Sequence, residues 1–156
     1  MTHAARSVLQ DCELALAILE AEQDFQKWRI HWVGALALLR AVGHVLHKVD
    51  GKRPESAAAI KAAYTMWKSD KTKHELFWEF IERERNNVLK EYTFNLHPLD
   101  EVSVAVEFQL VNLANGKPAK TQHVIPIGDN IYRPLLDSFR EGDDARDVYQ
   151  EAISWW

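Results

Sequence analysis

Cysteine is almost absent from this chain of 156 residues, because Cys12 is the only one. A single cysteine cannot form an internal disulfide, which is typical of proteins in a reducing compartment. Residues 1–6 lack the basic-then-apolar pattern of a secretory signal, and no apolar run reaches the roughly 18 residues that a membrane span requires. The sequence therefore predicts a cytoplasmic protein with no membrane contact.

Several well-known catalytic patterns are also missing. The sequence has no glycine-rich phosphate loop, no Cys/His spacing of a zinc site and no Gly-x-Ser-x-Gly elbow, and its serines have no neighbouring His/Asp signature. The acidic run over residues 141–144 fits a helix start capped by Asp143 or Asp144 better than a cation loop. We therefore expect neither a cofactor nor a metal.

An excess of basic residues is lacking as well, since the formal net charge is −4. This balance excludes a broad basic face for nucleic acid and leaves only a local patch. The 47% of hydrophobic and 27% of charged residues are typical of a globular chain, and there is no internal repeat. Length and composition together predict one domain over residues 1–156.

Apolar residues recur at helical spacing over most of the chain. The break between the first two helices is placed near Asp24 on length alone. Pro54 opens the third helix, the Thr72–Glu75 capping box starts the fourth, and His97-Pro98 ends it. The expected helices cover residues 6–24, Phe25–Lys48, Pro54–Lys68, Thr72–Phe94, Asn130–Arg140 and Asp144–Trp156.

The apolar period changes to two between Val102 and Leu110, which predicts a half-buried strand. Asn115-Gly116 turns the chain into a second strand over Thr121–Ile127, which Pro126 restricts to a sheet edge. The predicted fold is mainly α, an antiparallel four- to five-helix bundle with a β-hairpin (residues 101–127) between its fourth and last long helices. The terminal pair Trp155-Trp156 is expected to dock on the bundle or on another subunit.

The predicted second helix is apolar on most faces between Trp32 and Leu46, which indicates that it is buried. Its side of small residues (Gly34, Ala37, Ala41) would let a neighbouring helix approach closely. Arg40 and His44 are the ionisable residues of this stretch, and with Arg29 and His47 they form a polar stripe.

Three interpretations of this stripe remain open. Arg40 could pair with a carboxylate of a neighbouring helix, since buried charges are usually paired. The stripe could instead line a polar cleft. The third interpretation is a metal site in which His44 and His47 share a helix face, with His74 and Glu75 as the nearest further ligands.

The predicted fourth helix places Arg85 in the middle of an apolar face made of Phe77, Trp78, Ile81, Val88, Leu89 and Tyr92. An arginine aimed at a core interface stays charged and needs acceptors for its five donors. Asn86 adds an amide beside it, whereas Lys90 is expected on the solvated side. The Arg85-Asn86 pair therefore either holds neighbouring helices together or binds an anion.

The segment from Trp78 to Tyr92, WEFIERERNNVLKEY, resembles the motif helix of the HEPN superfamily. These helical-bundle domains are common in prokaryotic toxin–antitoxin and defence systems, and many are metal-independent endoribonucleases. The family motif is an arginine, a polar residue and a short spacer ending in histidine. Arg85 and Asn86 match the first two positions, and the histidine position falls on Lys90. The hairpin lies outside the resemblance.

The resemblance implies RNA cleavage by attack of the ribose 2′-hydroxyl on the adjacent phosphate, with the arginine stabilising charge and the histidine moving protons. A lysine is protonated at neutral pH and cannot act as a base, so cleavage is expected to be weak or absent. The expected partner is RNA, and the site would be completed in a homodimer. The expected catalytic residues are Arg85, Asn86 and Lys90, and the expected binding residues are Arg40, His44 and Tyr92.

The alternative function is a non-catalytic interaction module of the antitoxin, immunity or scaffold type. It predicts no cleft at Arg85, and an exposed apolar surface around the hairpin or around Trp155-Trp156 that a protein partner would cover.

Overall fold

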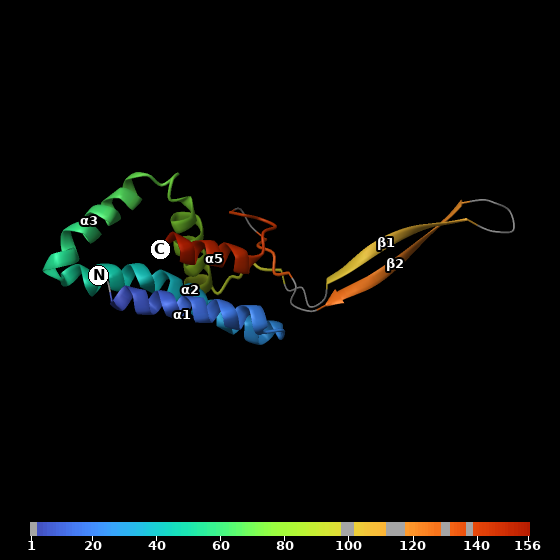
Figure 1. The fold of residues 1–156 in the computed structure, drawn as a ribbon, viewed down its shortest axis with the longest axis horizontal. Helices are drawn as coiled ribbons and strands as arrows, with labels where there is room; N and C mark the ends of the chain where they lie inside the picture. Colours follow the sequence, from blue (N-terminus) through green and yellow to red (C-terminus); the bar gives the residue numbers. More distant parts are fainter. Residues whose placement is uncertain (1–2, 98–101, 112–117, 129–131, 137–138) are drawn as a thin grey trace.

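The computed structural model describes residues 3–97, 102–111, 118–128, 132–136 and 139–156. Across these ranges the chain is mainly helical, and a two-stranded antiparallel hairpin follows the fourth helical region (Figure 1). The predicted fold class, a helical bundle with a β-hairpin, is therefore confirmed.

The first two helices, α1 (Ala4–Ala21) and α2 (Phe25–Lys48), lie side by side along one face of the bundle (Figure 1). The chain breaks between them as predicted, at Asp24. The Asp24 carboxylate accepts hydrogen bonds from the backbone N–H groups of Gln26 (2.9 Å) and Lys27 (3.1 Å). This capping satisfies donors that a new helix leaves open, so the break has a local cause in the sequence.

The start of α1 is capped from a distance. Asp50, in the 3₁₀ turn η1 (Asp50–Lys52) that follows α2, is fully buried. Its carboxylate accepts from the backbone N–H groups of Ala5 (3.0 Å) and Ala4 (3.4 Å). These bonds lower the pKa of Asp50 below its ordinary value, the bond from Ala5 contributing most. The sequence gives no local sign of this role, because 45 residues separate Ala5 from Asp50.

The helix α3 (Pro54–Ser69) begins at Pro54 as expected and leads to the helix that carries Arg85. We call residues 76–91 the motif helix; it consists of η2 (Leu76–Glu82), α4 (Arg83–Asn86) and η3 (Asn87–Glu91), of which the first and last are π-helical. Asp70, not the predicted capping box at Thr72, caps the turn before it by accepting from the N–H of Lys73 (3.0 Å).

The motif helix ends earlier than predicted, at Glu91 and not at Phe94. Tyr92 adopts a left-handed conformation (φ 53°), which stops the helix. Of the expected stop signal His97-Pro98, His97 lies in an extended segment, and Pro98 is outside the described residues.

The predicted helix over Asn130–Arg140 is wrong for the residues described there, 132–136 and 139–140. Leu135 forms an antiparallel bridge with Leu96, and the backbone N–H of His97 donates to the carbonyl of Pro134 (3.1 Å). Pro134 has no N–H and disfavours a helix interior, so this apolar segment satisfies its backbone by pairing with residues 95–97.

The hairpin pairs β1 (Val102–Val111) with β2 (Pro118–Gly128), with Phe108 opposite Thr121. It extends away from the helices, at the right of Figure 1. The expectation of a half-buried strand is wrong, because Val104, Phe108 and Leu110 expose 44%, 45% and 53% of their surface. Pro126 does lie on an edge, as both strands of a two-stranded sheet do, and Asn115-Gly116 falls outside the described residues.

The last helix, α5 (Ala145–Trp155), begins at Asp144, whose carboxylate caps it by accepting from the N–H of Arg146 (2.9 Å). It packs against α1 and η2 and closes the core. In that core the rings of Trp28 and Trp32 stack at 5.3 Å, and Tyr149 donates a hydrogen bond to the carbonyl of Ala35 (3.1 Å).

The C-terminal tryptophans dock on the bundle, the first of the two predicted outcomes. The Trp155 ring stacks on Phe77 at 5.3 Å, and both tryptophans contact Trp67. A Cβ atom at Gly43 would lie 2.5 Å from the Trp156 ring. The close approach to α2 therefore occurs at Gly43 and not at the predicted Gly34, where nothing lies within 4 Å.

One 18-residue window in Phe25–Lys52 has a mean hydropathy of 1.2, which is enough by length and composition for a membrane span. The sequence prediction that no such run exists therefore needs correcting. A core helix passes the same test, and α2 does bury Trp28, Trp32 and Leu36 against the other helices.

Candidate functional site

Arg85 lies half-buried on the motif helix, where this helix packs against α2. Its Nη1 donates a hydrogen bond to the Asn86 side-chain oxygen (2.8 Å), a neutral acceptor. Within the described ranges Arg85 takes part in no ion pair. The guanidinium is therefore not locked by a carboxylate and keeps donors for another ligand.

The faces of the motif helix differ from those predicted at a regular helical spacing. Glu84, not Arg85, is the deeply buried residue, with 5% of its surface exposed, and Leu89 and Tyr92 of the predicted apolar face are exposed. The π-helical hydrogen bonds, which join residues five apart, widen the turn and shift the positions that point inward. Burial raises the pKa of Glu84, although hydrogen bonds from Asn95 oppose the shift.

Arg40, on α2, places its guanidinium 5.6 Å from the centre of the Phe77 ring. A cation over an aromatic face is attracted electrostatically by the ring quadrupole. In the part of the chain that the structure describes, Arg40 forms no ion pair. The interpretation in which Arg40 pairs with a carboxylate is therefore wrong for these residues.

His44, one turn further along α2, shares its electrostatic environment with both arginines. Partial loss of hydration, then the positive charges of Arg40 and Arg85, lower its pKa below the ordinary histidine value. Lys48 adds to this shift, and Glu82 opposes it. His44 nevertheless exposes much of its surface to solvent. Arg40 and His44 lie one turn apart on α2, and α4, which carries Arg85, packs against that helix. We call Arg40, His44 and Arg85 the α2 corner.

The remaining predicted site residues lie elsewhere. Lys90 is exposed, and Tyr92 exposes 67% of its surface. Arg29 lies with its guanidinium 6.0 Å from the Tyr92 ring and 5.4 Å from that of Phe94. Arg29 is 11 residues before Arg40, about 16 Å along α2 at the rise of a regular helix. Tyr92 is therefore not part of the α2 corner.

The interpretation of His44 and His47 as a metal site is not supported by the contacts of the described residues. His47 packs its ring on Tyr64 at 5.4 Å, and His74 is buried edge-on against Trp155 at 5.6 Å. The described residues contain no group of three or more His, Cys, Asp or Glu side chains that could hold a metal ion. The two ring contacts give these histidines a packing role.

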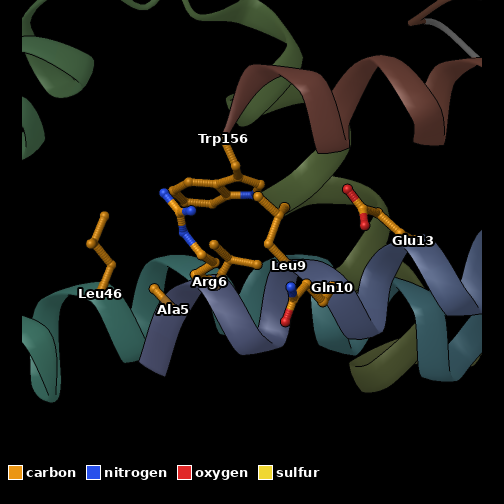
Figure 2. Close-up of a pocket in the computed structure, with 8 residues that line it drawn as sticks. Ala5, Arg6, Leu9, Gln10, Glu13, Leu46 and Trp156 are labelled. Atoms are coloured by element: carbon orange, nitrogen blue, oxygen red, sulfur yellow. The ribbon is translucent and has the colours of Figure 1, made fainter. Parts of the chain in front are cut away.

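A separate hollow of about 350 Å³ lies where Trp156 meets α1 and α2 (Figure 2). Its wall combines the opposite charges of Arg6 and Glu13 with the apolar side chains of Leu9, Val42 and Leu46. In Figure 2 Arg6 rises from α1 toward the Trp156 indole. The sequence analysis did not identify this hollow, because it depends on the docking of the C-terminal residue.

Two residues of the α2 corner were not predicted from sequence. Glu82 supplies a carboxylate near His44, and Phe77 supplies the ring that supports Arg40. The proximity of Glu82 to His44 and of Phe77 to Arg40 depends on how two helices pack, which no local sequence pattern encodes.

Two guanidinium groups and an imidazole close to one another form an arrangement suited to an anion. Guanidinium groups match the oxygens of a phosphate, and the neutral imidazole can accept a proton. Asn86 can both donate and accept beside them. No protein-family model, curated protein or solved structure matches this chain.

Proposed function

We propose that this chain is a HEPN-like RNA-acting module of the toxin or defence type, whose α2 corner binds an RNA phosphodiester and cleaves weakly or not at all. The observation that carries the proposal is the state of Arg85. Its guanidinium donates a hydrogen bond to the neutral Asn86 amide. Its positive charge, together with that of Arg40, contributes to the lowered pKa of His44. A phosphate would supply an anionic partner to the guanidinium groups of Arg40 and Arg85, which form no ion pair within the described residues.

The chemistry of the corner favours binding over cleavage. Arg85 and Arg40 can hold phosphate oxygens and stabilise developing charge. Proton transfer needs a base, and Lys90 is a poor one. The lowered pKa of His44 keeps its imidazole neutral at neutral pH, so His44 is the group at this corner that can accept a proton.

The test measures binding of mixed RNA at low salt by the wild type, Arg85→Ala and Arg83→Ala. Arg83 is the matched control, because it lies on the same helix but pairs with Glu79 at 2.6 Å. We expect Arg85→Ala to weaken binding by about tenfold or more, the effect of losing a charge-assisted phosphate contact, and Arg83→Ala to change it little. No binding by the wild type, or equal losses in both variants, would end the proposal.

A second arm tests cleavage. Lys90→His restores the histidine position of the motif that Arg85 and Asn86 otherwise match. RNA cleavage by Lys90→His and not by the wild type would identify a decayed nuclease. Intact RNA with every variant, together with binding that depends on Arg85, would identify a binding module.

The second candidate function is a non-catalytic interaction module, and the exposed apolar hairpin favours it. This function requires no RNA contact at the α2 corner. It is the better description if the wild type does not bind RNA and the hairpin is needed for the protein to associate.

A further inference from the structure

The hollow beside Trp156, which we call the Trp156 hollow, has an apolar floor that is fixed by packing. Ala5 and Val42 line it with 4% of their surface exposed, and Leu46 is half-buried. The Trp156 ring forms a wall (Figure 2) and packs so closely on α2 that a Cβ atom at Gly43 would lie 2.5 Å from it. At about 350 Å³ the hollow falls within the size range of small-molecule sites, roughly 300–1,000 Å³.

One face of α1 supplies the polar rim of this hollow. Arg6, Gln10 and Glu13 line it and follow one another at the spacing that places helical side chains on the same face. All three side chains are exposed. Within the described residues Arg6 and Glu13 take part in no ion pair, and the Gln10 amide can both donate and accept. The rim therefore offers a positive charge, an amide and a negative charge, in that order along the helix.

The wall contains a polar group without a partner. The indole Nε1 of Trp156 is buried and has no hydrogen-bond partner among the described residues. Figure 2 shows the indole beside Leu9, which also lines the hollow. A buried donor without an acceptor is rare and costs free energy. A ligand oxygen that displaces the half-buried Leu9 side chain would supply the acceptor, which favours a ligand with carbonyl or carboxylate groups over a purely apolar one.

We infer that the Trp156 hollow binds a short zwitterionic peptide of two or three residues that has an apolar side chain. The α-carboxylate of the peptide pairs with Arg6, whose planar guanidinium matches the two carboxylate oxygens, and the α-ammonium pairs with Glu13. A peptide amide between the two charges meets Gln10, and the apolar side chain covers the floor.

Charge and length together select this ligand. An anion without an ammonium group would bring a second negative charge to Glu13, and a cation without a carboxylate would bring a second positive charge to Arg6. Arg6 and Glu13 are seven residues apart in the sequence, which is about 10 Å along a regular helix. An extended peptide of three residues spans at most about 10–11 Å. The site is separate from the α2 corner and does not depend on the proposed RNA binding.

The first test measures binding of the tripeptide Ala-Leu-Ala and of its C-terminal amide by isothermal titration calorimetry, with the wild type and Arg6→Gln. We expect the wild type to bind the free carboxylate form at least about tenfold more tightly than the amide, the effect of losing one charge-assisted pair. Arg6→Gln should bind both forms with the same, weaker affinity. This double comparison isolates the pair, because a general disturbance of the hollow would leave the preference intact.

The second test compares Ala-Leu-Ala with its N-acetylated form in the same way. The wild type should prefer the free amine by about tenfold, and Glu13→Gln should show no preference. Asp11→Asn is the matched control, because Asp11 is exposed on the same helix but does not line the hollow. It should retain the wild-type preference.

An NMR titration locates the bound peptide. The indole N–H signal of Trp156, identified by its loss in Trp156→Phe, should shift in proton–nitrogen correlation spectra as Ala-Leu-Ala is added. The signal of Trp28 is the internal control and should stay unchanged, because this indole is fully buried and donates to the carbonyl of Leu19 (2.9 Å).

Three results of the binding measurements would overturn the inference. They are no binding by the wild type at the highest soluble peptide concentration, a preference for the carboxylate form that Arg6→Gln retains, and a preference for the free amine that Glu13→Gln retains. Equal affinities of the wild type for capped and uncapped peptides also overturn it, since the ligand would then be held by apolar contacts alone. A peptide that binds without moving the Trp156 signal would place the site elsewhere.

Discussion

His44 is the residue whose chemistry depends most directly on its neighbours at the α2 corner. Removing the charge of Arg85 takes away one cause of its lowered pKa. We therefore predict that Arg85→Ala raises the pKa of His44, measured from the imidazole proton shift in an NMR pH titration. Arg83→Ala is the control and should leave it unchanged. If the pKa of His44 is the same in Arg85→Ala as in the wild type, Arg85 and His44 do not share the α2 corner.

Asp50 is a second residue whose contribution depends on pH. Its pKa is lowered in the fold, so the stability it provides is present above about pH 4, the ordinary range of an aspartate, and is lost as the pH falls through the lowered value. We predict that Asp50→Ala reduces the free energy of unfolding by about 1 kcal/mol at pH 7, as loss of a helix cap does.

The measurement is urea unfolding of wild type and Asp50→Ala at pH 7 and again in acid. The difference should shrink in acid, because the wild-type carboxyl is then protonated. Asp11→Ala, at an exposed position of α1, is the control and should have little effect. A difference that does not change with pH would mean that the Asp50 carboxylate is not the active cap.

Among the elements, α2 contains two glycines in opposite situations. Gly34 has open space around its missing side chain, whereas a Cβ at Gly43 would lie 2.5 Å from the Trp156 ring. We predict that Gly34→Ala stabilises the protein by about 0.5–1 kcal/mol, because alanine loses less backbone entropy in a helix. Gly43→Ala should destabilise it by about 1–2 kcal/mol, because the clash outweighs the same gain.

Urea unfolding measures both changes, and tryptophan fluorescence reports whether Trp156 moves. Equal stabilisation by the two substitutions would show that the C-terminal tryptophan does not pack on Gly43.

The motif helix shows what periodicity predicts and where it fails. Its existence and the segment around Arg85 were predictable, because the apolar spacing is strong. The inward-facing residues were not, since a count at regular helical spacing puts Arg85 at the centre of the buried face, whereas Glu84 occupies the deepest position. Two stretches of this helix are π-helical, and a count at the regular helical spacing does not anticipate them.

On the scale of the whole molecule, the bundle and the hairpin are separable. Residues 95–97 pair with residues 134–136, so the two connections to the hairpin meet at the bundle. We predict that replacing residues 98–131 with a short Gly/Ser linker leaves the helical bundle folded. The melting temperature should change by less than about 4 °C, the shift that 1 kcal/mol produces in a domain of this size.

Circular dichroism and thermal melting test this prediction. Loss of helical structure would mean that the hairpin is part of the bundle's core.

The sequence by itself determined the hairpin and the helices other than the one predicted over Asn130–Arg140, because capping residues such as Asp24 and Asp144 and the change of apolar period act locally. It also indicated Arg85, Arg40 and His44, since ionisable residues in apolar helices are conspicuous. Only the tertiary structure decided that these three share one corner, that Asp50 caps a helix 45 residues away, and that the hairpin's apolar side stays exposed. These relations depend on how helices cross and on what covers a face, and contacts between distant residues have no local period.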